Sequence, residues 1–358
     1  MTTNLGRFPA NVHTSAANSI IMKTETFLNA LAIRAVLTSK REKLFMDLPK
    51  NPSLFYRLKK DKTIHSMLSL PESLYRPLSS FFQLFSFLKD IKWGAWGLIA
   101  FYISLLSGII VGLQYDYLNP FYSTTAIDLL TPYGRFFRSL HFFSSQFFFF
   151  FCCVHLLAIY DKTQNYSPLE WIQLVGVLPL ILLLLFTGYI LRGDNTGSSA
   201  GIIAENIMQA IPVLGPPLND LLFSLSNSGL RKVYIHHVIA LDLLLLIFAW
   251  NHLRIYRIKV REHLPLIAAI LIFSVFVSAP LEPDRLGISY TAGPWFFLGL
   301  QELLRYFPPF FAGVAVPGLF VITFFLAHPA NKYLRVIVNL LVFSISCYAI
   351  LSCIAWNR

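Results

Sequence analysis

Residues 138–155 read RSLHFFSSQFFFFFCCVH, an apolar and strongly aromatic run with His141 near one end and His155 at the other. An α-helix turns about 100° and rises about 1.5 Å per residue. The spacing of fourteen residues therefore keeps both histidines near one helix face. It separates them by roughly 21 Å, most of a hydrocarbon core about 30 Å thick. This stretch predicts a membrane-crossing helix with an imidazole close to each surface.

A second run of the sequence repeats this arrangement. Residues 237–252 read HVIALDLLLLIFAWNH and put His237 fifteen residues before His252. Ionisable residues are rare inside membrane helices and usually have a function, so two matched pairs are hard to explain as packing. His236 competes with His237, but it is sixteen residues from His252, which puts it on roughly the opposite helix face. We therefore favour His237 as the functional residue.

The two histidine pairs are suited to hold iron. If the two helices face each other, His141 opposes His237 and His155 opposes His252. Imidazole is a common axial ligand of haem iron, and a second axial histidine leaves no open position for oxygen or substrate, which favours electron transfer. We therefore predict two non-covalent, bis-histidine haem b groups. His141 and His237 would hold the iron near the positive side of the membrane. His155 and His252 would hold the iron near the negative side.

The composition is that of an integral membrane protein. Hydrophobic residues make up 56% of the 358 residues and charged residues only 13%, whereas soluble domains contain about 25% charged residues. Apolar runs long enough to span a bilayer recur along the chain. We predict an all-α fold with about seven transmembrane helices, a four-helix di-haem bundle followed by three helices. The expected spans are residues 94–115, 134–159, 169–191, 232–256, 263–280, 309–328 and 333–356.

Three regions follow from this pattern. Residues 1–88 form a basic, polar extension with several prolines, residues 89–258 the four-helix domain, and residues 259–358 the three-helix domain. An amphipathic helix lying on the membrane is expected at the end of the extension, because phenylalanines cluster there: Phe81, Phe82, Phe85 and Phe87.

The positive charge is uneven and predicts an orientation. The net charge is +11, and residues 1–92 contain 14 of the 29 Lys and Arg residues. In a membrane protein this favours a cytoplasmic flank beside anionic lipid and not nucleic-acid binding. We therefore expect the N-terminus on the cytoplasmic side and, after seven spans, the C-terminus on the positive side. The bacterial inner membrane is the simplest such energy-transducing membrane.

These residues together resemble the cytochrome b family of bc-type complexes. Spacings of fourteen and fifteen between the paired histidines are similar to the plastid and cyanobacterial branch, whose four-helix and three-helix parts look fused here. The resemblance covers roughly residues 90–356. It implies haem-facing glycines at Gly94 and Gly108 and basic residues near haem propionates or the negative-side quinone pocket, namely Arg138, Lys232 and Arg257.

The resemblance also implies a quinol pocket on the positive side. Residues 210–215, AIPVLG, resemble the short helices that close this pocket, and Pro294-Trp295-Phe296 stands where the family has Pro-Glu-Trp-Tyr. The missing acid matters, because a carboxylate near the quinol oxygen can act as a base. Glu302 is a candidate substitute, with the alternative that it is a structural acid. Trp295, Phe296 and Glu302 are thus the expected quinol-site residues.

The sequence departs from the family pattern at two further positions. The glycine expected fourteen residues before Gly188 is Leu174, and the nearest glycine is Gly176; Pro179 could shift this helix. Lys92 stands where some plastid-type relatives have a cysteine that attaches an additional haem. Because the chain also contains no C-x-x-C-H stretch, we expect no covalent haem c.

The resemblance implies a subunit of a quinol:cytochrome c, or similar acceptor, oxidoreductase that works by a Q cycle coupled to proton translocation. The implied partners are a Rieske-type iron–sulfur protein, a c-type cytochrome, quinol, lipids and a second copy of the chain. Two alternatives stay open at this point: a di-haem membrane anchor of a dehydrogenase or hydrogenase, and a haem-free transporter with histidine proton relays.

Overall fold

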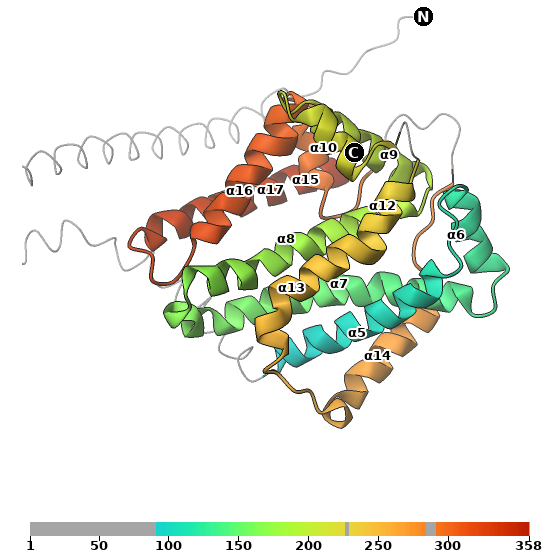
Figure 1. Cartoon of the computed structure of the whole chain (residues 1–358), viewed down its shortest axis with the longest axis horizontal. Coiled ribbons are helices and arrows are strands. Elements are labelled where there is room, and N and C mark those ends of the chain that lie inside the picture. Colours follow the sequence, from blue (N-terminus) through green and yellow to red (C-terminus); the bar gives the residue numbers. More distant parts are fainter. Residues whose placement is uncertain (1–90, 226–228, 284–290, 358) are drawn as a thin grey trace, which may run out of the picture. The chain divides into compact units, whose positions relative to one another are not determined.

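A computed structural model describes residues 91–225, 229–283 and 291–357. Within these ranges the regular structure is entirely helical (Figure 1), which confirms the predicted all-α class. The basic extension and its expected amphipathic helix lie outside the described residues.

Four long helices form the first part of the fold. They are α5 (Trp93–Gly112), α7 (Gly134–Ile159), α8 (Pro168–Leu191) and a fourth helix built from α12 (Arg231–Ile235), η2 (His236–Ala240) and α13 (Leu241–Leu253). In the fourth helix η2 is a single π-helical turn between two α-helical segments. Figure 1 shows the four helices packed side by side.

Five helices of the described chain are long and apolar enough to cross a membrane. They are the four helices of the bundle and α17 (Leu334–Trp356). The expected fifth and sixth spans are shorter: α14 (Leu264–Phe276) has 13 residues, and η4 with α16 covers Phe311–Leu326. At about 1.5 Å per residue, α14 is roughly 20 Å long. The extended conformation at Val277 ends it earlier than the hydropathy pattern predicts.

Local features mark where α7 and α8 begin. Ser167 and Glu170 form a reciprocal capping box at the start of α8, with Pro168 in the first turn, where a missing N–H has no consequence. Tyr133 precedes α7 in a left-handed conformation (φ 59°). α8 continues through Pro179, so this proline does not end the helix.

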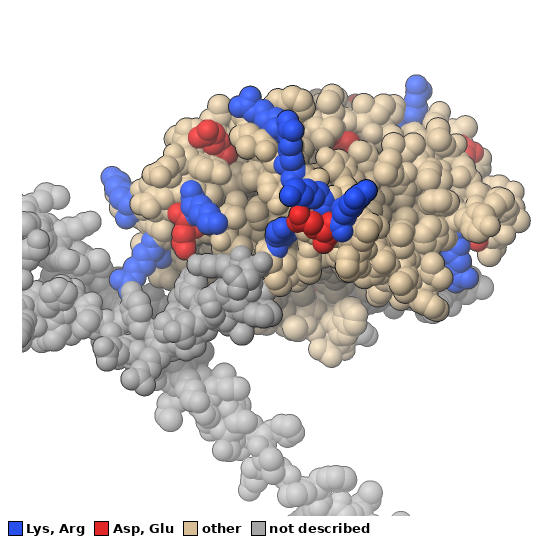
Figure 2. Space-filling view, turned by 90° about the horizontal axis from the view of Figure 1, so that it is seen from below, with Lys and Arg blue, Asp and Glu red and all other residues tan. Residues whose placement is uncertain are grey.

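The core lies between the long helices. Leu98 and Phe101 of α5 pack with Leu180, Ile181 and Leu185 of α8 and with Leu245 of α13. Many outward-facing side chains are also apolar; Phe343 on α17 is 66% exposed, for example. Figure 2 shows charged side chains in a few small groups on an otherwise uncharged face. This surface is expected of a protein whose helices face lipid, and the chain is an integral membrane protein.

Short helices gather at one end of the bundle, where α5 and α8 end and α7 and α12 begin (Figure 1). They are α6 (Pro120–Leu129), α9 (Asn195–Gln209) and α10 (Gly215–Leu222). We call this the capped end; His141 and His237 lie toward it and His155 and His252 toward the opposite end. α15 (Leu298–Leu303) packs against α17.

Candidate haem and quinol sites

The histidine pair toward the capped end joins α7 to the π turn. The ring centroids of His141 and His237 are 6.1 Å apart, and the rings are nearly perpendicular. His141 Nδ1 is 2.8 Å from the carbonyl oxygen of Ser104, so this nitrogen donates. His237 Nδ1 is 3.0 Å from Thr187 Oγ1, whose own hydroxyl donates to Leu183 O. Because both Nδ1 atoms donate, both Nε2 lone pairs are left to bind a metal.

The second pair lies in a cavity toward the opposite end. The ring centroids of His155 and His252 are 5.8 Å apart. Both residues line a cavity of about 620 Å³ together with Gly94, Leu98 and other residues of α5, α7, α8 and α13. Within the described residues no group hydrogen-bonds to the buried His155 Nε2. A buried imidazole nitrogen without a partner is unfavourable, and a metal-centred group in the cavity would satisfy it.

Both separations fit one metal ion between two imidazoles. Metal–imidazole bonds of about 2.0–2.1 Å, with ring radii of roughly 1.1 Å, give a centroid separation of roughly 6 Å. The observed values are 6.1 Å and 5.8 Å. The donor sets and the spacing therefore fit two bis-histidine groups.

Glycines let three of these rings lie against helix backbone. A Cβ added at Gly108 would be 2.7 Å from His141, one at Gly94 would be 2.8 Å from His155, and one at Gly188 would be 2.9 Å from His237. Such distances are too short for a side chain, so only glycine fits.

The ring of the fourth histidine, His252, has no such glycine opposite it on α8. A Cβ at Gly176 would meet the ring of Phe248 and not a histidine. Leu174, the residue at the register expected for glycine, lines the cavity that contains His155 and His252. α8 therefore presents a larger side chain to this cavity than the family pattern implies.

The π turn at His236–Ala240 explains the unequal histidine spacings. A π turn takes up one more residue than an α turn. It absorbs the fifteenth residue between His237 and His252, so both rings point toward α7 as they would at a spacing of fourteen. His236 points elsewhere, since its Nε2 hydrogen-bonds to Leu221 O at 2.9 Å. The sequence contains no clear signal for the π turn other than the spacing itself.

The predicted basic residues mostly contact protein groups. Arg138 is buried, forms two hydrogen bonds of 2.5 Å with Asp128, and also donates to the carbonyls of Ala279 and Pro280 at 2.8 and 3.3 Å. Lys232 donates to the carbonyl of Asp220. These contacts fix loops at the capped end and do not supply a propionate contact, which stays a prediction.

Two further basic residues lie at the end opposite the capped end. Arg257 is exposed in the segment after α13. Lys92 forms an exposed ion pair of 2.7 Å with Glu262, which raises the pKa of Lys92 and lowers that of Glu262 through their hydrogen bond and opposite charges. Lys92 thus links the start of α5 to the segment before α14.

The three residues expected at the quinol site have different surroundings. Trp295 is 53% exposed, and its indole N–H donates to Gln146 Oε1 of α7 at 2.9 Å. Phe296 packs against the core of α5, α8 and α13. Glu302 is fully buried on α15 and accepts a 2.9 Å hydrogen bond from Tyr306. Its carboxylate is therefore inside the protein, as expected for the structural alternative.

The segment 210–215 connects α9 to α10, so the short helices expected after the third span are present. α9 also reaches the second part of the fold: a Cβ at Gly313 would be 2.6 Å from Ile207. This contact brings α9 against η4.

A buried charged network at the end of α8 was not predicted. Asp194 pairs with Arg192 and accepts hydrogen bonds from Thr196 Oγ1 at 3.0 Å, Gly197 N at 2.9 Å and Glu282 N at 2.9 Å. It therefore caps α9 and at the same time holds the segment that follows α14. The sequence offered one signal, the polar stretch Arg192-Gly193-Asp194-Asn195 directly after the third apolar run.

A bundle of apolar helices with two facing histidine pairs, three of the four rings against a helical glycine, defines a membrane cytochrome. The family described as "Cytochrome b/b6/petB" matches residues 86–260, which are the four-helix part. Over these residues, just under half of the chain, the chain matches the cytochrome b family. This match implies haem b binding and a place in electron transport.

Individual relatives agree with this assignment. The chain is 27% identical over 174 residues to "Cytochrome b6" of Heliomicrobium gestii, covering 46% of this chain and 81% of that protein. The value is 26% over the same length for "Cytochrome b6" of Heliobacterium modesticaldum. A solved structure, "Hyperthermophilic respiratory Complex III", matches with a TM-score of 0.56 at 20% identity over 74% of this chain and 82% of that one. At this identity the match shows a shared fold.

Proposed function

We propose that the chain is the di-haem cytochrome b subunit of a quinol-oxidising bc-type complex. The observation that supports this best is the geometry of the two histidine pairs, with ring centroids 6.1 and 5.8 Å apart. His141 and His237 would ligate the iron toward the capped end, and His155 and His252 the other iron. Residues 89–258 would then be the haem domain and residues 259–358 the domain that completes the quinol site.

The protein's own residues orient the ligands. When bound, haem b supplies one-electron transfer along the membrane normal. Ser104 O and Thr187 Oγ1 accept the Nδ1–H protons of His141 and His237, so both rings are held with Nε2 toward the metal position. Gly94, Gly108 and Gly188 admit the rings, and the apolar helices exclude water.

Quinol oxidation would take place at the capped end. The segments available there are the connection of α9 and α10, Trp295 with Phe296, and the segment 279–282 held by Asp194 and Arg138. In a Q cycle one electron leaves to a Rieske-type iron–sulfur protein and a c-type cytochrome. The other crosses the membrane to a quinone at the opposite end, near Arg257, with proton release and uptake on opposite sides.

The proposed setting follows from the charge pattern and the relatives. The N-terminus would lie on the cytoplasmic side of a bacterial inner membrane and the C-terminus on the positive side. The shared fold with a respiratory Complex III supports assembly into a larger complex, with two copies of this chain.

Haem quantitation in the purified full chain with its native partners tests the proposal. We expect two haem b per chain and a b-type signal in the reduced-minus-oxidised spectrum. His237→Leu should remove one haem and leave the other, and the matched neighbour variant His236→Leu should leave both. Absence of haem from the wild-type protein would exclude the proposal and favour the transporter alternative.

A second candidate is a di-haem membrane anchor that passes electrons between quinone and a dehydrogenase or hydrogenase. The observation in its favour is the missing acid before Trp295, together with the burial of Glu302. Co-purification separates the two: a Rieske-type subunit supports the bc-type complex, and a hydrogenase-like or dehydrogenase subunit supports the anchor.

A further inference from the structure

A hollow outside the haem and quinol sites lies where α14 ends beside the start of α7. Its volume is about 770 Å³, and its lining comes only from these two segments: Tyr133, Arg135, Phe136, Ser274, Val275, Phe276 and Ser278. It exists because α14 ends at Phe276, after roughly 20 Å of helix. Within the described residues, α14 therefore leaves this side of the beginning of α7 uncovered.

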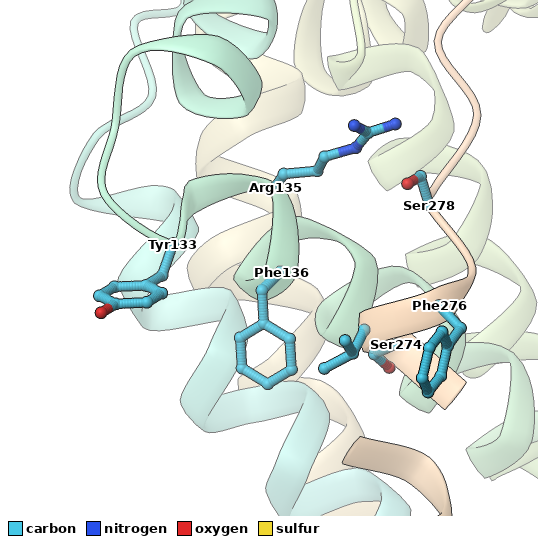
Figure 3. Close-up of a pocket in the computed structure, with 7 residues that line it drawn as sticks. Tyr133, Arg135, Phe136, Ser274, Phe276 and Ser278 are labelled. Carbon is cyan, nitrogen blue, oxygen red and sulfur yellow. The ribbon is translucent and has the colours of Figure 1, made fainter. Parts of the chain in front are cut away.

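The hollow is polar at one level and apolar at another. Figure 3 shows Arg135 and Ser278 together on one side and the rings of Phe136 and Phe276 on the other. α7 starts at this end and α14 finishes there, so Phe276 lies deeper in the membrane than Ser278. Val275 and Phe276 are 63% and 81% exposed, and such apolar surface at this depth is suited to acyl chains.

Arg135 gives the hollow its charge. It is exposed, and no acidic side chain within the described residues forms an ion pair with it; the nearby Asp128 is paired with Arg138. Ser274 uses its proton in a hydrogen bond to Ile270 O, so only its lone pairs face outward. The guanidinium is thus the positively charged group in the hollow that can bind a phosphate oxygen directly.

From this arrangement we propose that the hollow is a specific site for an anionic phospholipid. Arg135 and the Ser278 hydroxyl bind the phosphate, Tyr133 lies at the interface as aromatic residues of membrane proteins commonly do, and an acyl chain runs along Phe136, Val275 and Phe276. The site is separate from the proposed haem and quinol chemistry and does not depend on it.

Native mass spectrometry of the delipidated complex, titrated with phosphatidylglycerol or phosphatidylcholine, tests the site. The wild-type protein should bind phosphatidylglycerol about fivefold more tightly, the factor expected for one basic side chain beside an anionic lipid. Arg135→Gln should remove this preference, and Arg135→Lys should retain most of it. The matched control Arg231→Gln changes an exposed arginine at the same end of the bundle and should behave as wild type.

A second variant tests whether lipid binding needs the volume of the hollow, independently of the charge of Arg135. Ser278→Trp fills the hollow and should weaken binding of both lipids while Arg135 stays in place. Haem content and helical circular dichroism verify that each variant is folded. The proposal is wrong if Arg135→Gln keeps the preference, if Arg135→Lys loses it fully, or if Ser278→Trp binds lipid as well as wild type. It is also wrong if a partner subunit covers the hollow and neither lipid binds.

Discussion

At the scale of single residues, the glycines opposite the histidines carry as much information as the histidines. A Cβ added at Gly108 would lie within 3 Å of the His141 ring, and one added at Gly94 within 3 Å of the His155 ring. The rings could not take their positions beside a larger residue, because a short contact with helix backbone cannot relax. The resemblance to the cytochrome b family implied both glycines. The sequence also showed Leu174 in place of the fourth glycine, and the structure adds that Leu174 lines the cavity of His155 and His252.

Gly108→Val should displace His141 and remove the haem toward the capped end, so that the haem content falls from two to one per chain. Gly94→Val should remove the other haem instead. The pyridine haemochrome assay measures both, and the two lost signals should differ in reduction potential.

The control for these variants is Gly318→Val, because an added Cβ at Gly318 has no neighbour within 4 Å. Two haems should remain in this variant. Retention of both haems in Gly108→Val would show that the His141 ring does not depend on this glycine.

At the scale of secondary-structure elements, the π turn sets the register of the fourth helix. His236–Ala240 form the turn, and the residues on its two sides keep α-helical geometry. A regular α-helix would rotate His252 by about 100° for one additional residue. Because the turn absorbs the extra residue, His252 keeps the direction that a spacing of fourteen residues would give it.

Deletion of Ile239 should convert the π turn into an α turn and leave His237 and His252 on one face, so both haems should be retained. The matched control is deletion of Phe147 from α7, which has no π turn between its histidines. This control should lose one haem, because His141 rotates relative to His155. Loss of a haem on deletion of Ile239, measured by the same assay, would contradict this role of the turn.

At the scale of the whole molecule, polar contacts hold the four-helix part and the three-helix part together. Trp171 N–H donates to Phe325 O at 2.8 Å, and Tyr160 O–H donates to Ala327 O at 2.6 Å. At the other end, Asp194 and Arg138 hold the segment 279–282. The two parts are consequently one packed body in the described chain.

Asp194→Ala should destabilise the protein by about 3 kcal/mol, because it leaves the charge of Arg192 buried without its partner. Asp194→Asn should have a smaller effect, since its one side-chain oxygen still accepts from Gly197 N, although Glu282 N, which bonds to the other oxygen of Asp194, loses its acceptor. Unfolding in mixed detergent micelles gives the free energies. Equal stability of Asp194→Ala and wild type would show that the pair makes no net contribution.

The sequence alone determined the class of protein, the positions of the long helices and the pairing of the histidines. It could do so because hydropathy and helical periodicity are local properties, and because ionisable residues inside a membrane are rare. Only the tertiary structure decided the early end of α14, the π turn, the protein partners of Arg138 and the burial of Glu302. These features depend on contacts between segments far apart in the chain, such as Asp194 with Glu282, and no local pattern encodes such contacts.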